Sequence, residues 1–150
     1  MNASYPTQVP IPFIGATKSV AGVFTLSPVT LTATNTDNTA EIDVAGIQQL
    51  VLSVKYTTGS AETNNVLNMT LQFSPDGTNY YQEATEAVST STITEYQGTR
   101  QFTGASAATA YSFRFAVPVA DVKKFKILFH ETGVASNFGT VSVLATISGQ

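Results

Sequence analysis

Two neighbouring stretches of the chain alternate between large apolar and polar side chains. In residues 49–57 every second position is apolar, namely Leu50, Leu52, Val54 and Tyr56. Residues 67–73 repeat the pattern with Leu67, Met69, Leu71 and Phe73. Because alternate side chains of an extended strand lie on the same face, each stretch predicts a β-strand with one buried face. The rest of the chain then has to cover those two faces.

A tight turn follows the second stretch directly. The residues are Ser74-Pro-Asp-Gly-Thr-Asn-Tyr-Tyr81. Pro75 presets the φ angle of the second turn position, and Gly77 can adopt a positive φ without a Cβ clash. The segment therefore predicts a β-hairpin, with Tyr80 beginning the return strand.

This hairpin carries a resemblance to a known class of proteins. A strand ending in Phe73-Ser-Pro-Asp-Gly-Thr-Asn-Tyr-Tyr81, after a Leu-x-Val-x-Tyr strand at residues 52–56, is similar to a pattern in small β-sandwich structural proteins of tailed bacteriophage virions. The resemblance extends over about residues 49–148. It implies that the chain is a component of a virion.

The remaining sequence predicts further short strands and no amphipathic helix. Short strands are predicted in ranges 18–34, 40–44, 80–85, 92–96, 100–103, 111–117, 122–130 and 140–148. Within the first range the alternation begins at Val29, and Pro28 before it predicts an edge or a bend. Residues 86–92 are small and polar and predict a loop, and residues 104–109 predict a flexible connection. About eight to ten short strands favour an all-β fold, an antiparallel two-sheet β-sandwich of jelly-roll or Greek-key type. We expect one such domain over residues 16–150.

Residues 1–15 predict an extended, proline-rich N-terminal arm. Three prolines fall within seven positions, which removes backbone donors and favours an extended or polyproline conformation. The arm is too apolar for a freely solvated tail, since it also carries Tyr5, Val9, Ile11, Phe13 and Ile14. It would therefore lie along its own domain or along an adjacent subunit, and both alternatives remain open.

Charge and cysteine content exclude several classes of function. The net charge is −3 with no long run of Lys or Arg, which argues against nucleic-acid binding by phosphate neutralisation. The chain has no cysteine and so no disulfide, thiolate chemistry or Cys-ligated zinc. We expect no membrane association, because no stretch approaches about 18 consecutive apolar residues. We also expect synthesis in the host cytoplasm without a signal peptide.

Candidate catalytic groups are sparse. His130 is the single histidine, and no Gly-x-Ser-x-Gly elbow accompanies it. The alternation places it on the polar side at a strand end, which is typical of a surface or turn histidine. A glycosidase pair needs only two carboxylates, and candidates near a predicted loop are Glu83, Glu86 and Glu95. We interpret these glutamates as ordinary surface residues and expect no enzyme activity.

A metal or other cofactor is not expected either. Asp76 and Asn79 carry oxygens that could bind calcium. The same side chains are the ones that such a turn uses to satisfy its own backbone donors, so we assign them to turn structure.

Two groups of side chains remain as candidates for binding a partner. Lys123, Lys124 and Lys126 form the only basic cluster, which either docks an acidic partner surface or is a solvated strand face that guards against edge pairing. Aromatic side chains that could stack on sugar rings are Tyr80, Tyr81, Tyr96 and Tyr111. Tyr111 belongs to an apolar pattern that predicts a core position.

The sequence thus favours a protein that works by attachment. The resemblance implies a head decoration or cement protein that binds the major capsid protein on the outer capsid surface, as a symmetric and trimer-like homo-oligomer. The arm residues and the lysine cluster are the predicted contacts. The alternative is a carbohydrate-binding or receptor-recognition module of a phage tail or baseplate.

Overall fold

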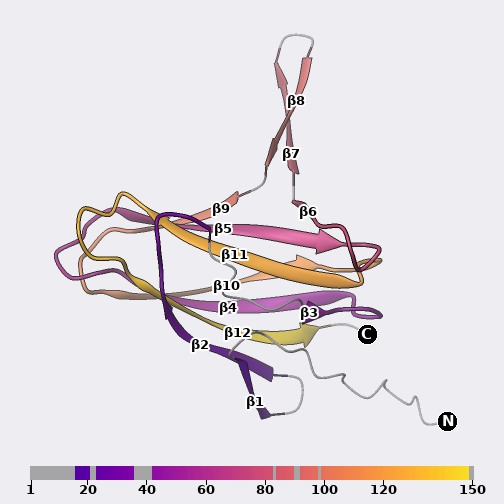
Figure 1. Ribbon diagram of the computed structural model, residues 1–150, viewed down its shortest axis with the longest axis horizontal. Coiled ribbons are helices and arrows are strands. Elements are labelled where there is room, and N and C mark those ends of the chain that lie inside the picture. Colours follow the sequence, from indigo (N-terminus) through magenta and orange to yellow (C-terminus); the bar gives the residue numbers. More distant parts are fainter. Residues whose placement is uncertain are drawn as a thin grey trace.

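Every strand pairing in the computed structural model of the chain is antiparallel. The structure describes residues 16–20, 23–35, 42–82, 84–89, 92–97 and 99–148, with side-chain exposure given for 28–35, 42–82 and 100–147. Two five-stranded sheets pack face to face, and a separate two-stranded ribbon leaves one of them (Figure 1). The predicted all-β sandwich is confirmed.

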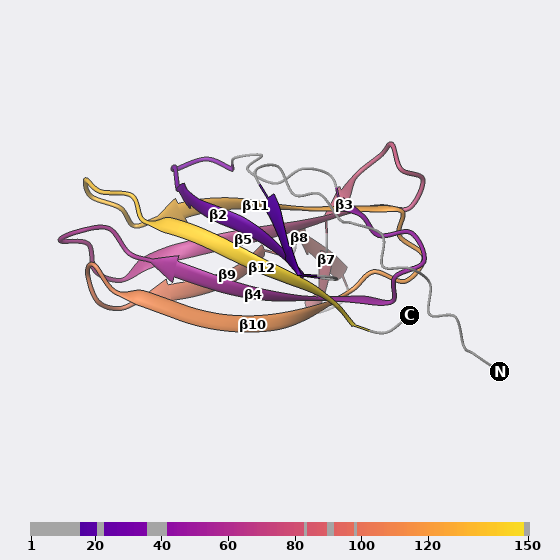
Figure 2. The ribbon, with the colours of Figure 1, turned by 90° about the horizontal axis from the view of Figure 1, so that it is seen from below.

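The first sheet is built around the first stretch that alternates in the sequence. Its order is β1 (Ala16–Val20), β2 (Val23–Thr30), β12 (Thr140–Ser148), β4 (Gln49–Thr57) and β10 (Ala110–Pro118). β4 pairs along its whole length with β10 on one side and β12 on the other. Figure 2 shows β2, β12, β4 and β10 in this order across the face of the molecule.

The second sheet is built around the second alternating stretch. Its order is β3 (Ile42–Asp43), β11 (Lys124–Thr132), β5 (Asn65–Ser74) and β6 (Tyr81–Gln82), with β9 (Thr99–Gly104) also pairing with β5. β6 and β9 lie one after the other along β5. The strand that returns along β5 therefore stops after Gln82 and resumes at Thr99.

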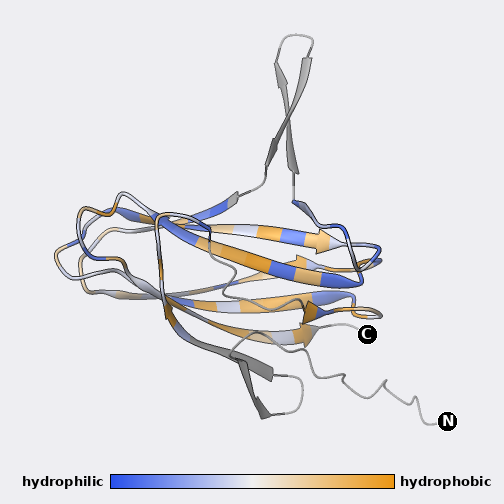
Figure 3. Cartoon of the chain, viewed as in Figure 1, coloured by the Kyte–Doolittle hydropathy of each residue, from blue (hydrophilic) through white to orange (hydrophobic). Residues whose placement is uncertain are grey.

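The core lies between the two sheets and contains the apolar side chains that the alternation predicted. Figure 3 shows apolar and polar residues alternating along β4, β5 and β11. The largest fully buried side chains are Tyr56, Phe125, Phe129, Leu31, Ile42, Leu50, Leu52, Leu67, Leu71 and Ile127. Burying one such side chain contributes about 1.5 to 3 kcal/mol, so this face supplies much of the stability.

The structure corrects the predicted loop at residues 86–92. The interruption between β6 and β9 holds a hairpin of β7 (Ala84–Ser89) and β8 (Thr92–Gln97), which extends away from the sandwich (Figure 1). The described residues accordingly contain twelve strands, more than predicted. The prediction was wrong because small polar side chains hide the alternation, and Val88 and Ile93 are the only aliphatic residues with a branched Cβ in the hairpin.

The pairing of β2 with β12 is irregular next to Pro28. The register of β2 against β12 shifts between Val141 and Val143, which pair with Val29 and Leu26. β2 therefore carries one extra residue at this point, a β-bulge that contains Pro28. A bulge tolerates proline because its residues do not need to donate a ladder hydrogen bond.

Candidate functional site

Most of the described candidates for partner binding lie in or beside one end of the sandwich, here called the turn end and defined as residues 45–48, 74–80 and 119–123. Tyr111 lies at the other end, where it pairs with Tyr56. The Lys123 amide donates to the Ser74 carbonyl at 2.9 Å, and the Val44 amide donates to the Lys123 carbonyl at 2.9 Å. Val119 likewise donates to Gln48 at 2.9 Å. Three segments that are distant in sequence are thus held together by backbone hydrogen bonds.

Asp76 organises the turn that the sequence singled out. The amides of Thr78 and Asn79 donate to its Oδ1 at 2.8 and 2.7 Å, and Asn79 Nδ2 donates to its Oδ2 at 2.7 Å. The Asn79 and Thr78 amides hold the pKa of the Asp76 carboxyl well below its usual range. Gly77 has φ +84°, the conformation predicted for it. Asp76 and Asn79 therefore do the structural work assigned to them in the turn.

The lysine cluster packs beside this turn. Lys124 and Lys126 lie opposite Ser74 and Gln72 on the outer face of the second sheet, and both are half-buried. A Cβ added at Gly77 would lie 3.8 Å from Lys123 Cδ and 4.0 Å from Lys124 Cε. The stems of both lysines therefore line the turn, while Lys123 is exposed.

Of the tyrosines proposed to stack on sugars, Tyr81 is the most accessible whose side chain is described. Its side chain is 59% exposed. The Lys126 ammonium lies 4.5 Å from the centre of the Tyr80 ring and covers one of its faces. Tyr111 is half-buried, with its ring centre 5.4 Å from that of Phe102, which confirms the predicted core position.

His130 lies on the outer face of β11, as the alternation predicted. Its Nδ1 is 2.6 Å from Asn35 Oδ1, and Asn68 lies opposite it on β5. Burial lowers the pKa of His130, which favours the neutral ring. A catalytic triad needs a carboxylate on the histidine, whereas this ring nitrogen meets an amide.

Two buried carboxylates at the opposite end of the sandwich were not predicted as sites. The first is Glu62, which is 3% exposed although it lies in a polar loop. Its oxygens accept hydrogen bonds at 2.6 to 2.9 Å from the backbone amides of Ala135, Ser136 and Asn137. These amides lower the pKa of Glu62 to about 2. Glu62 thus holds its own loop against the loop that contains residues 135–137.

We expect this lowered pKa to make stability depend on acid. The folded protein prefers ionised Glu62, so its contribution is complete above the usual pKa of about 4.5 and is lost as the pH falls toward about 2. Thermal unfolding should show a smaller drop in Tm between pH 6 and pH 3 for Glu62→Gln than for the unchanged protein. Equal drops would show that Glu62 is not a source of this dependence.

The second buried carboxylate is Glu131, which is 1% exposed. The Tyr56 hydroxyl donates to its Oε1 at 2.5 Å, Asn65 Nδ2 donates to the same oxygen at 3.3 Å, and the Gly139 amide donates to Oε2 at 2.6 Å. Burial and the hydrogen bond to Glu131 raise the pKa of Tyr56 well above its usual range. Glu131 continues the inward row of β11, so an acid at an apolar position was the signal that could have found it.

Glu62 and Glu131 therefore accept hydrogen bonds from loop backbone amides, and Glu131 also accepts them from neighbouring side chains. Within the part of the chain that the structure describes, no group of three or more His, Cys, Asp or Glu is arranged to hold a metal ion. In the same residues, no helix is long and apolar enough to cross a membrane.

Several predicted site residues cannot be placed in this geometry. The arm contacts Tyr5, Val9, Ile11, Phe13 and Ile14 lie outside the described residues, as does Glu83. The side chains of Glu86, Glu95 and Tyr96 also lie outside them, and only the backbone pairing of these residues is described. Compared with known proteins, the chain matches no protein-family model and no curated protein sequence.

Proposed function

We propose that the chain is a non-enzymatic structural protein of a bacteriophage virion. It would act as a capsid decoration or cement protein, bound to the major capsid protein on the outer capsid surface as a trimer-like homo-oligomer. The proposal is supported by the resemblance at Phe73 to Tyr81. Its strongest support is that this same segment forms a turn held by hydrogen bonds to Asp76 and lined by Lys123 and Lys124.

A pinned turn suits attachment to a large surface. Hydrogen bonds to Asp76 fix the turn before binding, so little conformational entropy is lost when it docks. The neighbouring lysines favour an acidic patch on the partner and speed the encounter with it. Contacts repeated by each subunit of an oligomer would add avidity on a capsid lattice.

Capsids that lack the protein provide the direct test. The unchanged protein should sediment with them and raise their resistance to heat. Replacing both turn lysines, Lys123→Gln with Lys124→Gln, should weaken binding about tenfold or more, because two charges leave the docking surface. Co-sedimentation over a range of protein concentrations measures this change.

A charge-matched control keeps the result specific. Ser60→Glu with Thr63→Glu changes the net charge by the same amount at two exposed positions of the opposite end. This variant should bind capsids as the unchanged protein does. The proposal would be lost if the unchanged protein neither bound capsids nor protected them, or if both variants bound equally well.

A second candidate is a carbohydrate-binding or receptor-recognition module of a tail or baseplate. It is favoured by the exposed ring of Tyr81 beside the turn. Tyr80 fits the role less well, since an ammonium group covers one face of its ring. Saturable binding in a glycan screen, abolished by Tyr81→Ala, would favour this function over capsid binding.

A further inference from the structure

A groove crosses the outer face of the first sheet, on the side away from the core. It has a volume of about 390 Å³ and is lined by residues of β4, β10 and β12. The strand register places Lys55 between Ser112 and Ser142, and it places Ser53 between Arg114 and Leu144. Small hydroxyl side chains thus form the floor, and two long cationic side chains rise from it.

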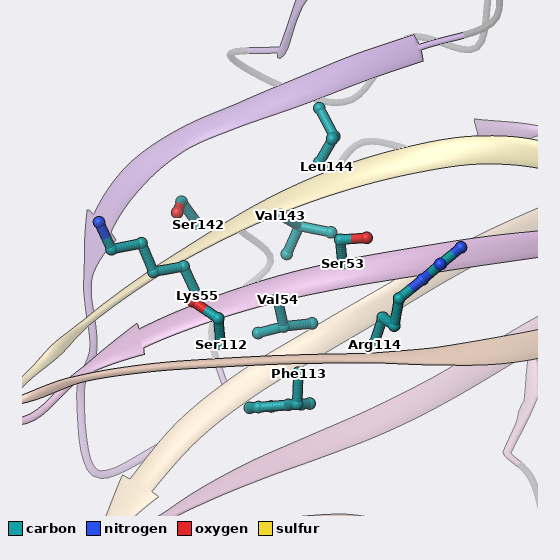
Figure 4. A pocket seen from close by; sticks show the side chains of 9 residues that line it. All are labelled: Ser53, Val54, Lys55, Ser112, Phe113, Arg114, Ser142, Val143 and Leu144. Carbon is teal, nitrogen blue, oxygen red and sulfur yellow. The ribbon is translucent and has the colours of Figure 1, made fainter.

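The two cations of the groove have no partner within the part of the chain that the structure describes. Lys55 and Arg114 are both exposed, and neither makes an ion pair or a side-chain hydrogen bond there. Figure 4 shows their side chains extending toward opposite ends of the groove, with Leu144 along the rim. Leu144 is 37% exposed, which is high for leucine in the middle of a sheet. The groove therefore offers two positive charges and one apolar contact.

The β7–β8 hairpin carries the complementary set of residues. Its register pairs Glu86 with Glu95 and Val88 with Ile93. Directly opposite residues of a ribbon, and those two positions further along, share one face, so two acids and two apolar residues belong to the same face. Like charges in opposite positions destabilise a ribbon, and a two-stranded ribbon is marginal by itself. Both features point to a partner that brings positive charge and apolar surface.

We propose that the β7–β8 hairpin of one copy of the chain docks into the groove of a second copy. The chemistry matches in kind: the two acids Glu86 and Glu95 would meet the two cations Lys55 and Arg114, and the pair Val88 and Ile93 would meet the single exposed Leu144. A copy cannot fill its own groove in this arrangement, because the hairpin leaves from the second sheet, on the opposite side of the sandwich from β4 and β12 (Figure 1).

Such a contact joins two different surfaces of the same chain. A head-to-tail contact of this kind generates a ring when its rotation closes and a filament when it does not. It gives the homo-oligomer of the proposed function a defined interface, but it does not depend on capsid binding. Self-association is measured on the isolated protein, so its failure is distinguishable from failure of the virion role.

Charge reversal tests the contact. We expect the unchanged protein to associate with rising concentration in sedimentation equilibrium, and less so at high salt. The groove variant Lys55→Glu with Arg114→Glu, and the hairpin variant Glu86→Lys with Glu95→Lys, should each associate about tenfold more weakly or worse. A protein that carries all four reversals should regain association, because every contact is again between opposite charges.

Two control variants complete the design. Thr85→Lys with Thr94→Lys adds two lysines to the other face of the hairpin and should leave association unchanged. Lys123→Gln with Lys124→Gln should also associate normally while it binds capsids poorly. The proposal would be overturned by a protein that stays monomeric at high concentration, by association that ignores the hairpin reversal, or by four reversals that restore nothing.

Discussion

Glu131→Ala is expected to lower the free energy of unfolding by about 3 to 5 kcal/mol, the largest effect of any single polar substitution considered for this chain. The change removes the shared acceptor of the Tyr56 hydroxyl, Asn65 Nδ2 and the Gly139 amide in a fully buried site. Each donor that stays buried without an acceptor costs about 1 to 3 kcal/mol. Urea unfolding followed by tyrosine fluorescence measures the difference.

A milder substitution separates this network from simple loss of packing. Tyr56→Phe removes the hydroxyl and keeps the buried ring, while Glu131 retains its bonds from Asn65 and Gly139. We expect a cost of about 1 to 2 kcal/mol for this variant. If Glu131→Ala cost no more than Tyr56→Phe, the carboxylate would not be the centre of the network.

The sheets could be predicted because burial acts on alternate residues. Where one face of a strand is apolar, as in β4, β5 and β11, the period of two is visible in the sequence and the structure has the strand. The strand order was not predictable, since β2, β12 and β4 become neighbours from opposite ends of the chain. Strands that pair across so long a stretch of chain leave no short-range sequence pattern from which their order could be predicted.

The hairpin shows where the same argument fails. Residues 86–89 of β7 were predicted as a loop because they are mostly small and polar, whereas β8 matches the strand predicted at residues 92–96. Glu131 shows a second limit. It occupies an inward position of β11, and what makes it acceptable there is a tyrosine and a glycine amide that only the fold brings to it.

Of the two candidate binding surfaces, one was likewise predicted from the sequence and the other was not. Lys124 and Lys126 were found from the sequence because their spacing places them on one strand face. The groove was not found, because Lys55 and Arg114 are 59 positions apart and each looks like an ordinary outward residue. Strand register alone places them on adjacent rows of one sheet.

Gly59→Ala is expected to cost about 3 kcal/mol, because its new Cβ would lie 1.9 Å from the carbonyl oxygen of Asn137. A backbone oxygen cannot rotate away as a side chain can. The loop that carries Asn137 is also held in place, since its amide donates to Glu62 Oε1 at 2.8 Å. The substitution therefore has to push apart two loops that Glu62 binds together.

The amides that donate to Glu62 allow the effect of Gly59→Ala to be measured at this site as well as in the stability of the whole protein. In Gly59→Ala, hydrogen exchange at Ala135, Ser136 and Asn137 should be faster than in the unchanged protein, because the separated loops lose these bonds. Gly46→Ala is the matched control: Gly46 has φ +80° and no atom within 4 Å of an added Cβ, so backbone strain alone should cost about 1 kcal/mol. Equal losses of stability in the two variants, with unchanged exchange at the three amides, would mean that the loops move apart at little cost and that Glu62 does not hold them together.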